Sequence, residues 1–370
     1  MGPEAAAQAL RARVPTGASV AEDVRAIIAD VRERGDAAVA DYESRFRETE
    51  GSDPVLSPEL AGALRLAYEN VFAVARASLT GDRDVELPQG QRVRVREVPV
   101  GSGGVYAPGG QAPYVSSVVM GVATARAAGV ERVAVCAGHP VMAAAAELCG
   151  ADEVHAMGGA HAVAALAYGT ETIAPVDVIV GPGSLYAQEA KRQVAGVVGI
   201  DGFAGPSDLV VIASEWSDAV ALDALAQAEH GAGTVVAVVG VDPPPVAGAE
   251  TVAVGNLEEA LAFAEAFAPE HLQLMGAEAE ALAPRVTRAG AVFVGTGTAF
   301  GDYVAGSNHV LPTEGAARFA SGLNVRHFLR VMTEVHIPPA AAARLAPAGV
   351  AIAEAEGFTA HAASMAARMT

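Results

Sequence analysis

The chain has 370 residues with 52% hydrophobic and 18% charged side chains, and its formal net charge at pH 7 is −19. This length can fill more than one compact core, and the apolar content excludes a largely disordered chain. Nucleic-acid binding draws on clustered Lys and Arg, so the acidic balance argues against DNA, RNA and anionic membranes as partners.

Targeting signals are not evident. No apolar segment follows Arg11 and Arg13 near the N-terminus, as a secretory signal would require. The longest uncharged stretch, residues 98–125, is interrupted by Gly and Pro and cannot form a spanning helix. Cys136 and Cys149 stand in apolar contexts, which suit a reducing compartment better than a disulfide. These features predict a soluble, cytoplasmic protein.

The first 99 residues are predicted to form a helical arm. Ser19 and Glu22 match a capping box, and apolar residues then recur at helical spacing until Gly35. A second helix is expected from Ser57, because Ser is a good N-cap and the Pro that follows suits the first turn.

From Val105 onwards, short apolar runs alternate with Ala-rich helical segments that often end at Gly. Strands that are apolar on both faces and alternate with helices indicate parallel sheets covered on both sides. The predicted fold class is therefore α/β, with two doubly wound, incomplete Rossmann-like parallel-sheet domains at residues 100–205 and 206–300. Residues 301–370 combine a polar, Gly-rich segment with a helical tail. The predicted strands are 132–136, 153–157, 176–180, 209–212, 234–241 and 291–294, and the predicted helices are 118–128, 141–149, 160–168, 185–194, 219–230 and 257–267.

The dinucleotide fingerprint G-x-G-x-x-G is missing, but shorter glycine turns are expected at residues 101–104, 109–110, 158–159 and 181–183. Each is a weak signal alone, because Gly at a strand-to-helix turn is usually steric. Together they suggest a ligand at the carboxyl edge of the first sheet, where helix N-termini could hold a phosphate.

Two pairs of polar residues could carry chemistry. Gln227 and His230 are three residues apart on a predicted helix and could bind one ion, although a polar helix end explains them equally well. Glu270 and His271 follow Pro269 at a rigid corner. A carboxylate beside an imidazole suits general base catalysis, unless the two side chains point apart.

Further polar residues lie near the C-terminus. Asp302 and His309 occupy a segment too polar for a core, and the tail adds Glu356 and His361. A mixed set of Gln, His and Asp could hold zinc through N and O ligands.

At these residues the sequence resembles the histidinol dehydrogenase family. The resemblance extends in the family's order over nearly the whole chain, which makes it more specific than any single motif. The matching stretches are 105–110, 158–160, 164–172, 180–183, 199–201, 204–207, 227–230 (QAEH), 268–272 (APEHL), 301–303, 308–313, 317–319 and 356–361.

The resemblance implies roles for individual residues. Zn²⁺ would be held by Gln227, His230, Asp302 and His361. Glu270 and His271 would be the catalytic pair. The remaining implied active-site positions are His309 and Glu356 beside the catalytic pair, Ser207 at the substrate, and Tyr106, His161 and Ser184 at or near NAD.

The activity implied by the resemblance is a four-electron oxidation of L-histidinol, through L-histidinal, to L-histidine with two NAD. His271 would take the alcohol proton, and Glu270 would activate the water that attacks the aldehyde. His309 would be a reserve acid or base. The tail ligand His361, with Glu356, would reach across a homodimer, so that each site is shared.

Several positions depart from the family pattern. His161 and Ser184 stand where Gln and Asn are usual, and Asp208 replaces the usual Glu. The chain is also shorter than typical members, chiefly between His230 and Phe267. These departures leave two alternatives open: a paralogous dehydrogenase of another small polar alcohol, such as a sulfonated propanediol, and a catalytically silent zinc-binding homodimer.

Overall fold

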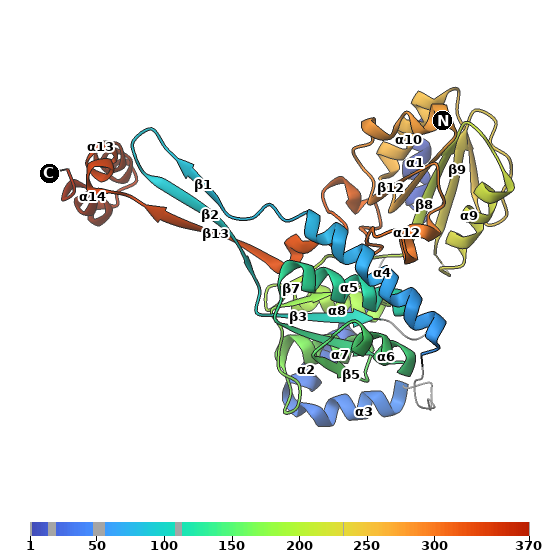
Figure 1. Cartoon of the computed structure of the whole chain (residues 1–370), viewed down its shortest axis with the longest axis horizontal. Helices are drawn as coiled ribbons and strands as arrows, with labels where there is room; N and C mark the ends of the chain where they lie inside the picture. The colour runs from blue at the N-terminus through green and yellow to red at the C-terminus, as the bar shows by residue number, and fades with distance from the viewer. Residues whose placement is uncertain (1, 14–19, 47–55, 108–112, 232, 370) are drawn as a thin grey trace. The chain divides into compact units, whose positions relative to one another are not determined.

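The computed structural model describes residues 2–13, 20–46, 56–107, 113–231 and 233–369. The chain forms two compact units, one made of Met1–Ser78 with Val100–Phe328 and the other of Leu79–Pro99 with Leu329–Thr370. Both parallel sheets belong to the first unit (Figure 1). Within the described ranges, no helix combines the length and apolarity that crossing a membrane requires.

The first parallel sheet has the strand order β5-β4-β3-β6-β7. α5 packs on β3 and β4, whereas α7 packs on β3 and β6. The chain reverses its direction across the sheet between β3 and β6, which is the topological switch point of a doubly wound fold. The elements are β3 (Ser102–Ala107), α5 (Val115–Ala128), β4 (Arg132–Ala137), α6 (Pro140–Leu148), β5 (Glu153–His155), α7 (Gly159–Tyr168), β6 (Val178–Val180), α8 (Leu185–Val194) and β7 (Gly199–Ile200).

The second parallel sheet repeats this topology with the order β10-β9-β8-β11-β12. Side chains alternate across β8: Leu209 belongs to a cluster with residues of α9, and Val210 to a cluster with residues of α10. Helices therefore cover both faces of the sheet, and every residue of β8 is buried. The elements are β8 (Asp208–Ala213), α9 (Asp218–Ala228), β9 (Val235–Gly240), β10 (Glu250–Ala253), α10 (Leu257–Phe267), β11 (His271–Met275), α11 (Ala277–Glu280), β12 (Ala291–Val294) and α12 (Ala299–Tyr303).

The N-terminal helices pack on helices that flank the two parallel sheets. α1 (Pro3–Arg11) packs on α10 of the second sheet. α2 (Ala21–Arg34) and α3 (Asp36–Phe46) pack on α7, and α4 (Pro58–Ala77) packs on α5. The Ser57 hydroxyl accepts a hydrogen bond from the Leu60 N–H, as expected of an N-cap. Ser19 of the predicted capping box lies outside the described residues.

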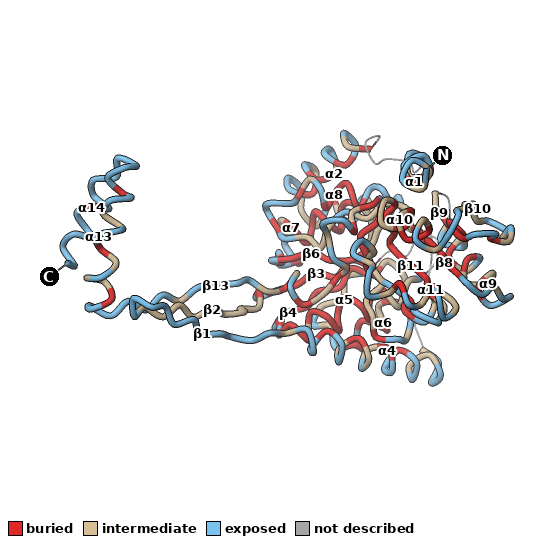
Figure 2. Tube along the Cα trace, turned by 90° about the horizontal axis from the view of Figure 1, so that it is seen from above, coloured by how far each residue is buried: buried red, intermediate tan, exposed pale blue. Residues whose placement is uncertain are grey.

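The second unit contains an antiparallel sheet of order β1-β2-β13 and two helices that pack on each other. Figure 2 shows its strands as intermediate or exposed, whereas the central strands of the parallel sheets are buried. The elements are β1 (Arg83–Glu86), β2 (Arg92–Pro99), β13 (Leu329–His336), α13 (Pro339–Ala355) and α14 (Thr359–Ala366).

The α/β fold class and the parallel sheets are confirmed, but two local expectations are wrong. Residues 83–99 form strands, not part of a helical arm. Residues 102–104 lie in the central strand β3 and not in a glycine turn. A Cβ on Gly104 would lie 3.0 Å from the Leu166 side chain, so these glycines let the packed helices approach the strand. We keep the two α/β domains at residues 100–205 and 206–300 as a proposal, because each range holds one parallel sheet.

Candidate active site

The site begins at the carboxyl end of α9. Gln227 is buried there, and its Nε2 donates to the Ser207 hydroxyl at 2.5 Å. Its Oε1 is also buried and has no hydrogen-bond partner among the described residues. His230 is exposed, and its Nδ1 lies 3.1 Å from the Gln227 carbonyl oxygen. A carbonyl can only accept, so Nδ1 donates, and Nε2 of a neutral ring would keep a lone pair for a ligand.

Glu270 and His271 face the same region from the amino end of β11. Glu270 Oε2 accepts from the Ser207 hydroxyl and, at 3.0 Å, from the Asp208 N–H. The same oxygen lies 3.5 Å from His271 Nδ1, so the two side chains do not point apart. Pro269 follows Ala268, which has a left-handed φ of 51°, and this rigid corner precedes the strand that begins at His271. Sequence patterning predicted the corner but missed the strand.

Asp302 is brought to His271 by a close approach of α12 to β12. A Cβ on Gly301 would lie 2.3 Å from Phe293 Cε1, so only glycine allows this packing. The His271 ring stacks on the same phenylalanine with centroids 5.6 Å apart. Asp302 Oδ1 then lies 3.2 Å from His271 Nε2.

His309 connects this group to the first sheet. Its Nδ1 donates to the Asp302 carbonyl oxygen at 2.7 Å, and its Nε2 lies 3.1 Å from the hydroxyl of Ser117 on α5. Burial lowers the pKa of His309, which favours a neutral ring. In that form Nε2 accepts from Ser117 and is the position where a proton could be taken up. The sequence did not identify Ser117, because α5 belongs to the other sheet.

Burial and neighbouring charges shift the pKa values of His271 and Asp302. Burial lowers the pKa of His271, but the Glu270 charge and the hydrogen bond to Asp302 outweigh it and raise the pKa to about 10. Burial raises the pKa of Asp302, yet the hydrogen bond from His271 and the charge of His271 bring it below its usual value. His271 and Asp302 therefore form an imidazolium–carboxylate pair near neutral pH, with His230 close enough to affect the carboxylate.

A further ion pair supports the backbone at Glu270. Asp208 Oδ1 accepts from the Glu270 N–H at 2.7 Å, and its Oδ2 accepts from Arg11 at 2.6 Å. Burial raises the pKa of Asp208 to about 6, although the Arg11 charge opposes this shift. Arg11 also contacts Phe267, with its guanidinium carbon 3.7 Å from the ring centroid. Sequence patterning gave Arg11 no role, since nothing near it in the chain indicates this contact.

Tyr106, His161 and Ser184 lie around the switch point of the first sheet. Tyr106 is buried in β3 and its hydroxyl accepts from the Gly159 N–H at 3.0 Å, at the start of α7. Ser184 is exposed at the N-terminus of α8 and its side chain makes no capping hydrogen bond. His161 is buried, and its Nε2 lies 2.8 Å from Glu43 Oε1. The His161 ring is therefore paired with the Glu43 carboxylate of α3, a contact that the sequence did not predict.

Glu356 and His361 lie in the second unit. Glu356 is the C-cap residue of α13, and His361 is on α14 with its ring centroid 5.4 Å from that of Phe358. Both side chains are exposed. The structure thus brings together Ser207, Gln227, Glu270, His271, Asp302 and His309, with His230 beside them, and leaves the two tail residues in a separate unit.

The residues present fit a metal ion of the kind the family resemblance implies. The unpartnered, buried Oε1 of Gln227 is a ready ligand, and Asp302 and His230 are close enough to interact electrostatically. In the described ranges no three His, Cys, Asp or Glu side chains converge on one ion. The implied set is consistent with this, because the unit that holds the site contributes one amide, one imidazole and one carboxylate.

The fold is α/β, and the candidate site lies at the amino end of β11, where Glu270 and His271 stand. The hydrogen bond between Ser117 and His309 links it to the first sheet. The comparisons specify this class further. The family model described as histidinol dehydrogenase matches residues 11–251 and 245–369. The chain belongs to the histidinol dehydrogenase family, and so to the NAD-dependent oxidoreductases.

Individual relatives agree over nearly the full length. The chain is 42% identical to a histidinol dehydrogenase of Gluconobacter oxydans (strain 621H), covering 97% of this chain and 95% of the relative. It is 41% identical to that of Rhizobium meliloti (strain 1021), covering 96% and 94%. The crystal structure of histidinol dehydrogenase from Elizabethkingia anophelis superimposes with a TM-score of 0.89 at 29% identity, covering 96% of this chain and 93% of that one.

The comparisons also bear on the expected shortening of this chain between His230 and Phe267. The alignment with the Gluconobacter relative spans 409 positions, more than the 370 residues of this chain. The two stretches matched by the family model overlap at residues 245–251, between His230 and Phe267. There the structure has only a turn with three prolines and the short strand β10 between β9 and α10.

Proposed function

We propose that this enzyme oxidises L-histidinol through the aldehyde to L-histidine, with Zn²⁺ held by Gln227, His230 and Asp302 and two NAD reduced per turnover. One observation carries the proposal: the Gln227 amide oxygen is buried with no partner among the residues that the structure describes, while its nitrogen is hydrogen-bonded through Ser207 to Glu270. When bound, the zinc ion would supply a template that holds the amine and imidazole of the substrate in place.

The first oxidation needs a base at the alcohol. His271 holds a proton in the site as described, because its Nε2 donates to Asp302. If Asp302 binds the metal ion, its negative charge would stabilise the His271 imidazolium less. The pKa of His271 would then fall, and the neutral ring could act as a base. His271 would take the alcohol proton while NAD accepts the hydride.

The second oxidation needs a nucleophilic water at the aldehyde. Glu270 Oε2 is oriented by the Ser207 hydroxyl and the Asp208 N–H, so its position is fixed on two sides. We assign Glu270 the activation of this water. His309, with a neutral ring held by Asp302 and Ser117, would be the reserve acid or base.

We place NAD at the switch point between β3 and β6. Gly183 packs on Tyr106 so closely that a Cβ would lie 3.0 Å from Tyr106 Cε1, and the uncapped N-terminus of α8 follows directly at Ser184. A helix start without a side-chain cap is suited to a phosphate. His161 would shape this site through its contact with Glu43.

Metal removal tests the function directly. Chelation of the purified protein is expected to abolish histidinol-dependent NADH formation, and addition of Zn²⁺ should restore it to at least half of its starting value. Zinc content should be measured in the same samples. Unchanged activity in a chelated sample that contains no zinc would contradict the proposed metal site.

We also propose a homodimer in which His361 and Glu356 of one chain complete the site of the other. The second unit supports this, because Val331, Val335 and Ile337 leave an apolar surface exposed on and beside β13. A second copy of this chain would cover that surface and bring His361 to Gln227, His230 and Asp302 as the fourth protein ligand that the family resemblance implies.

A mixing experiment tests the shared site. Chains with His361→Asn and chains with His271→Asn should each be inactive alone. Dimers formed by unfolding and refolding the two together should regain up to about a quarter of wild-type activity, because one site in each mixed dimer has all its residues. Mixed dimers without activity would show that each site is built from one chain.

A further inference from the structure

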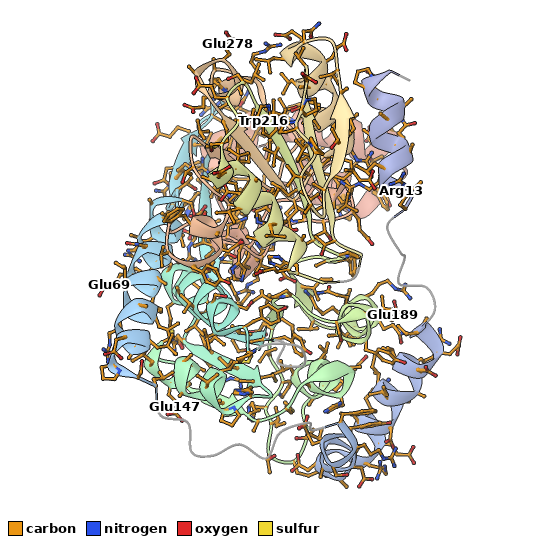
Figure 3. The ribbon with its side chains drawn as sticks, turned by 90° about the vertical axis from the view of Figure 1, so that its right-hand side faces the viewer. Arg13, Glu69, Glu147, Glu189, Trp216 and Glu278 are labelled. Carbon is orange, nitrogen blue, oxygen red and sulfur yellow. The ribbon has the colours of Figure 1, made fainter. Side chains whose placement is uncertain are left out.

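Lys191 is the only lysine in the sequence, and it is buried. It lies on α8, the helix on which Figure 3 labels Glu189. Its side chain is 2% exposed and forms an ion pair with the 5% exposed Asp201, which follows β7. A buried ion pair costs desolvation energy that hydrophobic residues of similar volume would avoid, so its position needs an explanation.

The pair holds both backbone polar groups of one residue. Lys191 Nζ donates to the Gly181 carbonyl oxygen at 2.9 Å, and the Gly181 N–H donates to Asp201 Oδ2 at 2.7 Å. Gly181 is the first residue after β6 and has a φ of +123°, which L-amino acids rarely adopt. Glycine reaches this φ without strain, so the ion pair is not needed to permit the conformation. It fixes the orientation of a residue that glycine would otherwise leave free to adopt others.

This peptide determines how the next residues meet Tyr106. A Cβ on Gly181 would lie 2.0 Å from the Tyr106 carbonyl oxygen, so the turn runs directly against β3. Gly183 then packs on the Tyr106 ring, and Ser184 begins α8. The turn at residues 181–183 thus connects the switch point of the sheet to the helix N-terminus, with the Lys191–Asp201 pair behind it.

We propose that Lys191 and Asp201 are positioning residues for the cofactor: they set the turn at residues 181–183 so that NAD can bind against Tyr106 and the start of α8. This inference rests on the proposed NAD site. Neither residue contacts the acid–base group of the second sheet in any described hydrogen bond or ion pair, so their effect should be confined to the cofactor.

The test compares Lys191→Met, Asp201→Asn and the double variant with Arg192→Met. Arg192 is the matched control, since it is the neighbouring basic residue and its ion pair with Glu189 leaves it 56% exposed. Lys191→Met should raise the KM for NAD and the dissociation constant of NADH at least tenfold, with the KM for histidinol and the zinc content unchanged. Arg192→Met should leave all four values unchanged.

The double variant separates positioning from stability. Removing both charges leaves no unpaired buried ion, so the thermal stability lost in Lys191→Met should largely return. The NADH dissociation constant should stay raised, because nothing then holds the Gly181 carbonyl. Recovery of NADH binding together with stability would overturn the proposal, as would unchanged binding in a folded Lys191→Met variant.

The wild-type chain offers a second measurement that needs no variant to fold. With lysine labelled by ¹³C at Cε, one side-chain NMR signal is expected, because Lys191 is the only lysine. NAD should shift this signal and L-histidinol alone should not; the reverse pattern would overturn the inference. A chain that binds NADH but oxidises no histidinol would contradict the proposed function, while the NADH affinities of the variants would still decide this inference.

Discussion

Replacing His271 by Asn is expected to lower turnover by about 10²–10⁴-fold while zinc stays bound. The loss follows from the removal of the group that we propose takes the alcohol proton. Its Nε2 lies 3.2 Å from Asp302 and its Nδ1 lies 3.5 Å from Glu270. Zinc should remain because Gln227, His230 and Asp302 are unchanged. The measurements are the initial rate of NADH formation and the zinc content of the same preparation.

His155→Asn is the matched control for this experiment. His155 also lies in a parallel strand and is 3.2 Å from a carboxylate, that of Glu153, but it belongs to the other sheet. Its replacement should leave turnover within twofold of the wild type. Loss of zinc from His271→Asn would mean that His271 is a ligand and that its assigned role is wrong.

Replacing Glu270 by Gln is expected to slow the aldehyde step more than the alcohol step. Gln keeps the shape and can still accept from the Asp208 N–H, but it cannot take a proton from water. Oxidation of added L-histidinal should therefore fall by about 10²–10⁴-fold. The single-turnover yield of the first NADH from histidinol should change by less than tenfold.

Glu259→Gln provides the control for the loss of a carboxylate. Glu259 Oε2 also accepts a backbone N–H, that of Gly255, at 2.8 Å, but Glu259 lies in the first turn of α10, whereas Glu270 and His271 follow the end of that helix. No described hydrogen bond joins Glu259 to either residue. Both oxidation steps should be unaffected. An equal loss of both steps in Glu270→Gln would contradict a role for Glu270 in water activation alone.

Much of the α/β core could be predicted because its signals are local. The helix that ends at Ala128 is closed by Gly129 with a left-handed φ of 90°, and the apolar run after it forms β4. Such stops and apolar runs recur along residues 115–267. The order of strands in each sheet then follows from the usual doubly wound topology.

The pairing of β2 with β13 could not be predicted, because the two strands are far apart in the chain. β1 and β2 are neighbours in sequence, and local patterning missed them. β2 pairs with β13 from Arg92↔His336 to Pro99↔Leu329, and no turn joins them. The same holds for residues 102–104, where packing against Phe328 and Leu166 keeps glycines in a strand. Local patterning treats these glycines as a turn, since it contains no information on the side chains that pack above them.

In the candidate site too, local features could be predicted and contacts between distant segments could not. The types of its residues and the Pro269 corner were evident from the sequence, and the family resemblance supplied their roles. The Arg11–Asp208 contact, the Ser117–His309 hydrogen bond and the burial of Lys191 depend on the packing of distant segments. His161 departs from the family pattern, and its contact with Glu43 of α3 could be found only in the folded chain.

We propose that one site performs both oxidations. The most direct measurement follows L-histidinol consumption and NADH formation in the same zinc-loaded sample, with histidine identified as the product. We expect two NADH and one histidine per histidinol consumed. One NADH per histidinol with accumulation of the aldehyde, or zinc-loaded protein that forms no NADH, would contradict it.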